Sequence, residues 1–201
     1  MFESVKKIFW RILFIPWKYS GRVSGFERLF RKVKDPWGFE GSVFEEERFK
    51  VMRELMLKTG CGSVIELGCG EGYFTEKISE DCSKLVCLDV SETAIARAMK
   101  RTCIPDYVVG DFTKDGVIPE KDYDVAVAGE VFYYIKEDDI PKVLEKIDPV
   151  YLITSNCLGL NHRCEEKIVE TGYTQLEKKT VKRLESPQPK KTTIILWMKK
   201  D

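Results

Sequence analysis

Short apolar runs alternate with helical stretches along most of this chain, and this alternation constrains the fold more than any other feature. The runs lie at residues 63–67, 84–90, 107–109, 123–128 and 150–154. Helices are predicted between them over residues 73–79 and 91–99, from Asp138 or Asp139 through Leu144, and over residues 165–170. Runs this apolar are typical of strands buried on both faces. The alternation therefore predicts an α/β fold with a doubly wound, mostly parallel sheet.

The two ends of this region follow other patterns. Before it, apolar residues recur at helical spacing from Phe44 to Met56, and Gly60 and Gly62 end the pattern. After it, the runs 175–185 and 192–199 are separated by too few residues for a helix. Two strands joined so tightly must be antiparallel, so we predict a C-terminal hairpin.

Glycines or polar residues, most of them acidic, mark the ends of the five apolar runs. The runs end in Gly68–Gly72, Asp89, Asp111, Glu130 and Ser155-Asn156. The carboxyl ends of parallel strands share one edge of a sheet, and open α/β sheets bind their ligands at that edge. We therefore expect a glycine loop and a series of acidic groups to face one ligand site.

The glycine loop, residues 68–72, suits a ligand that approaches the backbone closely. Glycine permits positive φ, and free N–H groups at the start of the following helix favour an anionic ligand group. The nicotinamide fingerprint G-x-G-x-x-G would need a third glycine at position 73, where this chain has Tyr73. A dinucleotide is therefore disfavoured, and a plain tight turn is the alternative interpretation of the loop.

Two aspartates that end the second and third runs are candidate ligand groups. Asp89 lies 21 positions after Gly68, where a carboxylate can accept hydrogen bonds from both hydroxyls of a ribose. Alternatively, it only forms the turn before Ser91, a good helix N-cap. Asp111 and Phe112 could bind an exocyclic amine and the face of a base, or Asp111 could simply end a strand.

The residues from Val64 to Gly72, with Asp89 and Gly110-Asp111-Phe112, resemble class I methyltransferases that use S-adenosylmethionine (SAM). The resemblance runs from about residue 60 to residue 200 and implies a seven-stranded sheet with a reversed last strand. It implies that Gly68 and Gly70 flank the methionine part of SAM. It also implies that Asp89 holds the ribose, while Asp111 and Phe112 hold the adenine. The remaining cofactor-binding residues expected from it are Glu66, Gly72, Val90 and Glu130.

A narrower resemblance is carried by Asp35–Phe39, Phe44-Glu45, Arg48-Phe49 and Gly129–Tyr134. These segments resemble the nodulation-type (NodS-like) branch, whose members N-methylate an amino sugar on a chitin-type oligosaccharide. The Asn/Asp-Pro-Pro-Tyr motif of many enzymes that methylate bases or protein amides is replaced by Gly129-Glu130-Val131-Phe132. DNA adenine methylation is therefore not expected.

Methyl transfer to an amine requires that the amine be unprotonated or lose its proton, so a proton acceptor is sought. Glu130 and His162 are the catalytic candidates; alternatively, Glu130 orders the cofactor and His162 is a solvated loop residue. We expect residues 35–49 to close over the cofactor, because aromatic faces attract a sulfonium or ammonium ion. The expected substrate and lid residues are Trp37, Phe39, Phe44 and Tyr134.

Charge divides the chain at residue 34. Lys+Arg and Asp+Glu number 33 each, so the net charge is zero and broad binding of nucleic acid is not expected. Residues 1–34 nevertheless hold nine basic and two acidic residues. We predict a basic amphipathic extension at 1–34 and a SAM-binding domain at 35–201, with 35–60 as a helical lid. Residues 1–20 would pack on the domain or contact a membrane surface peripherally.

The seven cysteines do not suggest a disulfide framework. Their number is odd, no C-x-x-C occurs and no cleavable signal peptide is visible, so we expect reduced thiols in a cytoplasmic protein. Cys157, His162 and Cys164 match no zinc pattern, and no metal is expected. No run has the ~18–20 apolar residues of a membrane span.

The sequence thus predicts a SAM-dependent methyltransferase that acts on a nitrogen or oxygen of a small molecule, with an amino sugar as one candidate. Two alternatives remain. One is a non-catalytic SAM-binding module that regulates a partner; the other, disfavoured by Tyr73, is a nicotinamide-dependent oxidoreductase.

Overall fold

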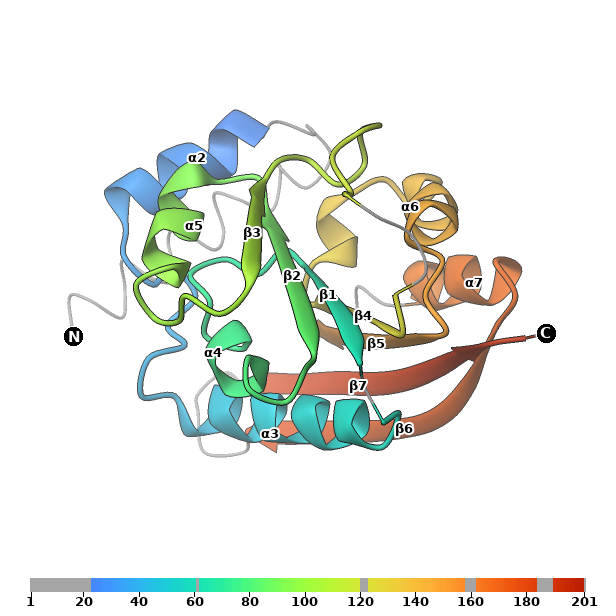
Figure 1. The fold of residues 1–201 in the computed structure, drawn as a ribbon. Coiled ribbons are helices and arrows are strands. Elements are labelled where there is room, and N and C mark those ends of the chain that lie inside the picture. Colours follow the sequence, from blue (N-terminus) through green and yellow to red (C-terminus); the bar gives the residue numbers. More distant parts are fainter. Residues whose placement is uncertain (1–22, 61, 120–122, 158–161, 184–189, 201) are drawn as a thin grey trace.

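A seven-stranded sheet forms the centre of the computed structural model, which describes residues 23–60, 62–119, 123–157, 162–183 and 190–200 (Figure 1). The strands are β1 (Ser63–Leu67), β2 (Lys84–Asp89), β3 (Asp106–Val109), β4 (Val125–Gly129), β5 (Tyr151–Cys157), β6 (Tyr173–Arg183) and β7 (Lys190–Lys199). Their order is β3-β2-β1-β4-β5-β7-β6. Strands β1 to β5 are parallel, and β7 is antiparallel to both β5 and β6. The predicted doubly wound sheet and C-terminal hairpin are confirmed.

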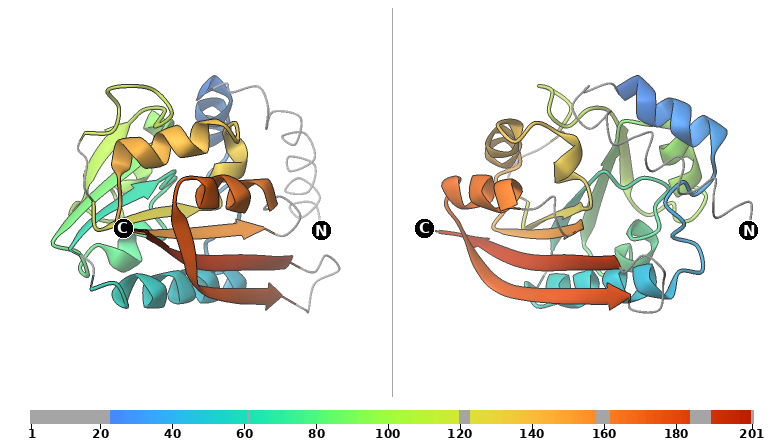
Figure 2. Two further views of the ribbon diagram at one scale, coloured as in Figure 1. Left: turned by 90° about the vertical axis from the view of Figure 1, so that its right-hand side faces the viewer. Right: turned by 180° about the vertical axis from the view of Figure 1, so that it is seen from behind.

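Helices cover both faces of the sheet (Figures 1 and 2). They are α2 (Val23–Lys32), α3 (Val43–Leu57), α4 (Thr75–Ile78), α5 (Glu92–Ala98), α6 (Asp139–Ile147) and α7 (His162–Glu170), with the 3-10 turn η2 (Phe132–Tyr134). Alternate strand residues face opposite layers. Val64 joins Leu55 of α3 in one apolar cluster, while Ile65 joins Leu144 of α6 in the other. The central strands are therefore buried on both faces, as their apolar sequences predict.

Serine side chains cap the N-termini of two helices, α3 and α5. Ser42 accepts a hydrogen bond from the Glu45 N–H (3.4 Å), and Ser91 accepts one from the Ala94 N–H (3.1 Å). Each satisfies an N–H group that has no partner within the helix. Ser91 is thus the predicted N-cap, and it fixes the start of α5 directly after β2.

Three of the differences between the structure and the predicted elements concern α7, β5 and β3. Helix α7 begins at His162 rather than Glu165, because Cys164 and Ile168 are buried four residues apart on one helical face. Strand β5 continues to Cys157, since β7 pairs with it as far as Thr192. Strand β3 was expected to be buried on both faces but lies at the edge of the sheet, where Val109 is 50% exposed.

The predicted amphipathic segment 1–20 lies outside the described residues. Helix α2, which falls within the predicted extension 1–34, packs against α5. Over the residues that the structure describes, no helix combines the length and apolar character needed to cross a membrane.

Candidate functional site

The strand order reverses between β1 and β4, and the glycine loop lies at this switch point. Gly68 and Gly72 have φ of +69° and +78°, a region that other residues rarely adopt. A Cβ atom at Gly68 would lie 2.6 Å from Val131, and one at Gly72 would lie 2.8 Å from Ala98. The Leu88 carbonyl accepts hydrogen bonds from the loop N–H groups of Gly68 (2.8 Å) and Cys69 (3.0 Å). The loop therefore requires its glycines and is fastened to β2.

Asp89 joins the glycine loop to helix α5. One carboxylate oxygen accepts a hydrogen bond from the Gly70 N–H (2.9 Å), and the other accepts one from the Ser91 N–H (2.9 Å). The side chain is buried, and this burial raises the pKa of Asp89 to about 6. Carboxylate oxygens have two lone pairs each, so both retain acceptor capacity for hydroxyl groups. Asp89 thus forms the turn before Ser91, and it also fits the predicted role of binding the hydroxyls of a ribose.

Glu66 lies beneath the loop, inside the protein. It accepts a hydrogen bond from the Thr75 hydroxyl (2.6 Å), and the Cys87 thiol lies 3.6 Å away. Desolvation raises the pKa of Glu66 to about 7. Because burial opposes ionisation of both Glu66 and Asp89, a cationic group entering this site would favour their charged forms. That charge pattern fits the sulfonium and ammonium groups of SAM.

Helix α2 covers the glycine loop and the start of α5. The sequence did not predict this contact. Glu27 accepts hydrogen bonds from the hydroxyls of Ser91 (2.6 Å) and Thr93 (2.7 Å) at the start of α5. These bonds, that from Ser91 foremost, lower the pKa of Glu27 to about 2. The ring of Phe30 lies 3.8 Å from the position of a Cβ at Gly70. At the other side, Phe26 contacts Tyr134 edge-on, with ring centroids 5.2 Å apart.

A second contact fastens the predicted lid segment to the loop. Glu71 accepts hydrogen bonds from the Asp35 N–H (2.8 Å) and from the Arg97 guanidinium, which also donates to the Phe30 carbonyl (2.8 Å). Trp37 packs between Phe30 and Phe39, and the ring centroids of Trp37 and Phe30 lie 5.2 Å apart. Residues 33–40 are thereby held beside α2 and the glycine loop.

The predicted substrate and lid residues fall into two groups. Phe39 packs against Trp37 and Phe49, and Phe44 is buried in the core on the α3 face. Tyr134 lies apart from them, between Phe26 and Tyr133. Tyr134, unlike Phe44, therefore lies near the carboxyl end of β4, in the turn η2 that follows this strand.

Glu130 lies at the carboxyl end of β4, in the left-handed region with φ +57°. One of its oxygens accepts hydrogen bonds from the hydroxyls of Ser155 and Thr192 (3.0 Å each). The other accepts one from the Tyr133 hydroxyl (3.0 Å). Four separate segments of the chain, from β4, η2, β5 and β7, thus meet at this carboxylate.

Arg48 of α3 extends this polar network into the core. Its guanidinium donates to the Ser155 hydroxyl (3.1 Å) and pairs with Glu45 (2.7 Å), and both charged side chains are only 3% exposed. The ring of Phe49 lies 4.5 Å from the guanidinium carbon. Contacts between residues so far apart in sequence leave no local pattern, which is why this network could not be predicted.

The remaining predicted residues are less closely connected to the loop. Asp111 accepts hydrogen bonds from the N–H (3.0 Å) and hydroxyl (2.6 Å) of Thr113, and Phe112 is buried in the core. Val90 is half-buried directly after Asp89. His162 is the first residue of α7, and its side chain lies outside the described part of the structure.

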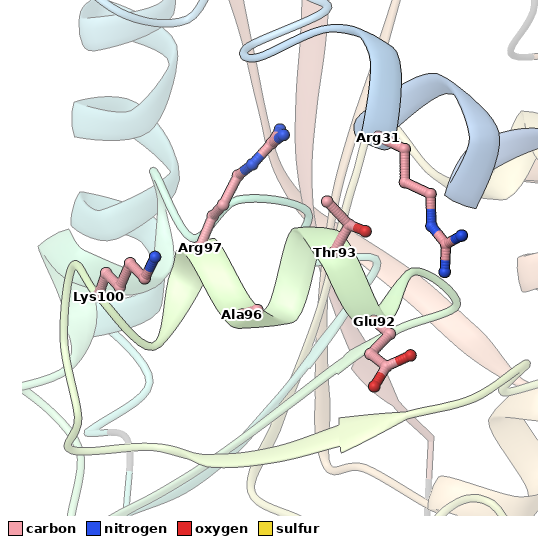
Figure 3. A pocket seen from close by; sticks show the side chains of 6 residues that line it. All are labelled: Arg31, Glu92, Thr93, Ala96, Arg97 and Lys100. Atoms are coloured by element: carbon pink, nitrogen blue, oxygen red, sulfur yellow. The ribbon is translucent and has the colours of Figure 1, made fainter.

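A separate hollow of about 380 Å³ opens between α2 and α5 (Figure 3). Its lining residues are Arg31, Glu92, Thr93, Ala96, Arg97 and Lys100. None of the predicted site residues is among them, so this hollow is distinct from the predicted cofactor site. Across the described residues, no group of three or more His, Cys, Asp and Glu side chains could hold a metal ion.

Known proteins resemble this chain in sequence and in fold. A family model described as Nodulation protein S (NodS) matches residues 25–154. Nodulation protein S of Sinorhizobium fredii is 33% identical over 122 residues, covering 58% of this chain and 56% of the relative. That of Rhizobium tropici is 36% identical over 105 residues, covering 50% and 43%. This chain therefore spans about half the length of the curated relatives it matches.

Solved structures share the fold. One is N-methyltransferase NodS from Bradyrhizobium japonicum WM9 in complex with S-adenosyl-L-homocysteine, with a TM-score of 0.73 and 22% identity. The match covers 88% of this chain and 99% of that one. Another is magnesium protoporphyrin IX methyltransferase from Synechocystis PCC 6803 with bound SAM, with a TM-score of 0.65 and 15% identity. It covers 79% of this chain and 81% of that one.

Proposed function

We propose, from the premise that this chain belongs to the nodulation protein S (NodS) family, that it is a SAM-dependent methyltransferase acting on an amine nitrogen of a small molecule. An amine nitrogen is favoured because one solved structure with the same fold is described as an N-methyltransferase. An amino sugar, the acceptor that the sequence resemblance implies, is the first substrate class to test. When bound, SAM supplies a methyl group on a positively charged sulfur and leaves as S-adenosylhomocysteine.

One observation carries the proposal: the carboxylate of Asp89 accepts a hydrogen bond from the Gly70 N–H, and the ring of Phe30 lies 3.8 Å from the position of a Cβ at Gly70. A carboxylate, the backbone of a glycine loop and an aromatic ring thus lie close together. Asp89 would bind the ribose hydroxyls, and the loop from Gly68 to Gly72 would bind the methionine part. Val90, Asp111 and Phe112 would complete the adenine side, and Glu66 would balance the positive charge from below.

The acceptor side of the site would lie at Glu130 and Tyr134, at the carboxyl end of β4. These residues would place the amine in line with the methyl group and exclude water. Alignment of two reactants can lower a barrier by roughly 7–11 kcal/mol in favourable cases. No metal or covalent enzyme intermediate is needed for such a transfer.

Calorimetry with SAM and with NAD tests the cofactor assignment. SAM should bind and NAD should not, and Asp89→Ala should weaken SAM binding by about 10- to 100-fold, the loss expected for a charge-assisted hydrogen bond. The exposed Glu145→Gln variant is a control that should bind SAM normally. An unchanged affinity in Asp89→Ala would remove this residue from the site.

Formation of S-adenosylhomocysteine from SAM tests the activity. We expect multiple turnovers with a member of a panel of amino sugars, simple amines and phenols. Turnover with phenols alone would move the reaction to oxygen, and binding of SAM without turnover would favour a regulatory module.

A further inference from the structure

Glu130 differs from an ordinary strand-ending carboxylate in the number of hydroxyl groups that converge on it. Ser155 and Thr192 contact one carboxylate oxygen, and Tyr133 contacts the other, all at 3.0 Å. We call Tyr133, Ser155 and Thr192 the hydroxyl clamp. Its members come from η2, β5 and β7, so the fold assembles it around the end of β4.

The direction of these hydrogen bonds follows from Arg48. A guanidinium has donors only, so the Ser155 oxygen accepts from Arg48 (3.1 Å) and its hydrogen is available to Glu130. Tyr133 also remains a donor: desolvation, followed by the charge of Glu130, raises the pKa of Tyr133 well above its ordinary value. Glu130 therefore accepts hydrogen bonds on both of its carboxylate oxygens.

The clamp, with the Arg48 guanidinium behind Ser155, holds the Glu130 carboxylate in a fixed orientation at the end of β4. Arg48 forms an ion pair with Glu45, which lies on the same helix α3, with 2.7 Å between Nε and Oε2. This pair fixes the position of the guanidinium. A carboxylate fixed in this way is placed to pair with a cation.

Resting on the proposed function, we infer that Glu130, held in place by the hydroxyl clamp, pairs with the ammonium form of the acceptor, whose proton then leaves to water before the transfer. Methylation needs the neutral amine, whose electron pair forms the new N–C bond as the C–S bond breaks. The nitrogen then carries a positive charge again. Glu130 would stabilise that charge both in the bound acceptor and as it develops during transfer. The acceptor class is accordingly a basic aliphatic amine.

Binding to the full chain in complex with S-adenosylhomocysteine tests this role without turnover. The probes are a glucosamine tetramer, its fully N-acetylated counterpart and benzylamine, titrated at pH values below and above the pKa of each amine. We expect each amine to bind at least 10-fold more tightly below its pKa. Glu130→Gln should remove this preference and weaken binding of the ammonium form by about 10- to 100-fold. The N-acetylated tetramer, which has no ammonium, should not distinguish the two proteins.

Paired variants of the clamp test the positioning residues. Thr192→Val should weaken ammonium binding by about 2- to 10-fold, whereas Thr192→Ser, which keeps the hydroxyl, should restore it. Neither variant should change binding of S-adenosylhomocysteine, and Glu145→Gln should behave as the unmodified protein.

Three results would overturn the inference. Tighter binding of the amine above its pKa would show that the site selects the neutral amine. A normal affinity in Glu130→Gln would remove Glu130 from the acceptor site. Binding of S-adenosylhomocysteine but of no amine would reject the ammonium site alone. Failure to bind S-adenosylhomocysteine would instead reject the proposed function.

Discussion

At the scale of single residues, the two buried carboxyl groups near the glycine loop set the pH dependence of the molecule. Burial raises the pKa of Asp89 from 3.8 to about 6 and that of Glu66 from 4.5 to about 7. In the unfolded chain both groups would release their protons at lower pH. Between these values the folded state therefore binds more protons than the unfolded state.

The protein without ligand should consequently lose stability as pH rises from about 4 to 7. The contribution of Glu66 and Asp89 is fully present below their unfolded pKa values and is lost as pH passes their folded ones. Bound SAM should offset the loss, because its positive charges favour the ionised carboxyls. Urea unfolding at pH 5 and pH 8, with and without SAM, measures this. A SAM-induced stabilisation that is equal at both pH values would contradict it.

Helix α2 shows how an element acquires a role that its own sequence does not display. Phe26, Leu29 and Phe30 have helical spacing, but they lie in the basic segment 1–34, which the sequence predicts as an extension of the domain. Only the position of α5 shows that Glu27 bonds to Ser91 and Thr93. By contrast, the ends of β1 and β2 could be predicted because apolar runs and glycines mark them locally.

Two truncations separate the roles of the N-terminal region. We predict that a chain lacking residues 1–22 binds SAM normally, whereas one lacking 1–34 binds it more weakly because α2 no longer covers Gly70. The shorter chain should still unfold cooperatively, since the sheet and α3 remain. Calorimetry and thermal unfolding of both chains measure this. An insoluble or molten product of the second truncation would place α2 in the obligatory core.

Helix α3 is joined to the sheet by a buried ion pair as well as by apolar packing. Arg48→Met should cost about 3–5 kcal/mol of unfolding free energy, because it leaves the Glu45 carboxylate buried and unpaired. The double variant Glu45→Gln/Arg48→Met should recover part of that loss, since no charge is then left uncompensated. Urea unfolding of both variants gives the comparison. Equal losses would show that Arg48 contributes by packing on Phe49 rather than by charge.

For the molecule as a whole, the parallel half of the fold was more predictable than the order of its strands. Runs such as 63–67 and 84–90 specify strands through their own residues, but exposure depends on position in the sheet. Strand β3 is apolar enough to be central and is nevertheless an edge, because the chain crosses to β4 on the other side of β1. The network that joins Arg48 to Ser155, 107 positions away, likewise exists only in the folded chain.

Hydrogen exchange should reflect this arrangement. We predict the slowest exchange in β1 and β4, which have neighbours on both sides and helices on both faces. Strand β3 should exchange faster, and α2 should become protected mainly when SAM is present. Mass spectrometry of exchanged peptides, with and without SAM, measures this. Equal protection of β1 and β3 would contradict the expected stability gradient.

The hydrogen bond from Thr192 to Glu130 spans 62 positions of the chain and has a consequence for biosynthesis. The glycine loop, Asp89 and their cover are all translated before β5, whereas β7 follows much later. A nascent chain could therefore form the cofactor half of the site while the ribosome is still adding the acceptor half. Until Thr192 has left the exit tunnel, Glu130 lacks one of the hydroxyl groups that hold it. A newly made molecule should thus become able to bind the cofactor before it can bind its acceptor.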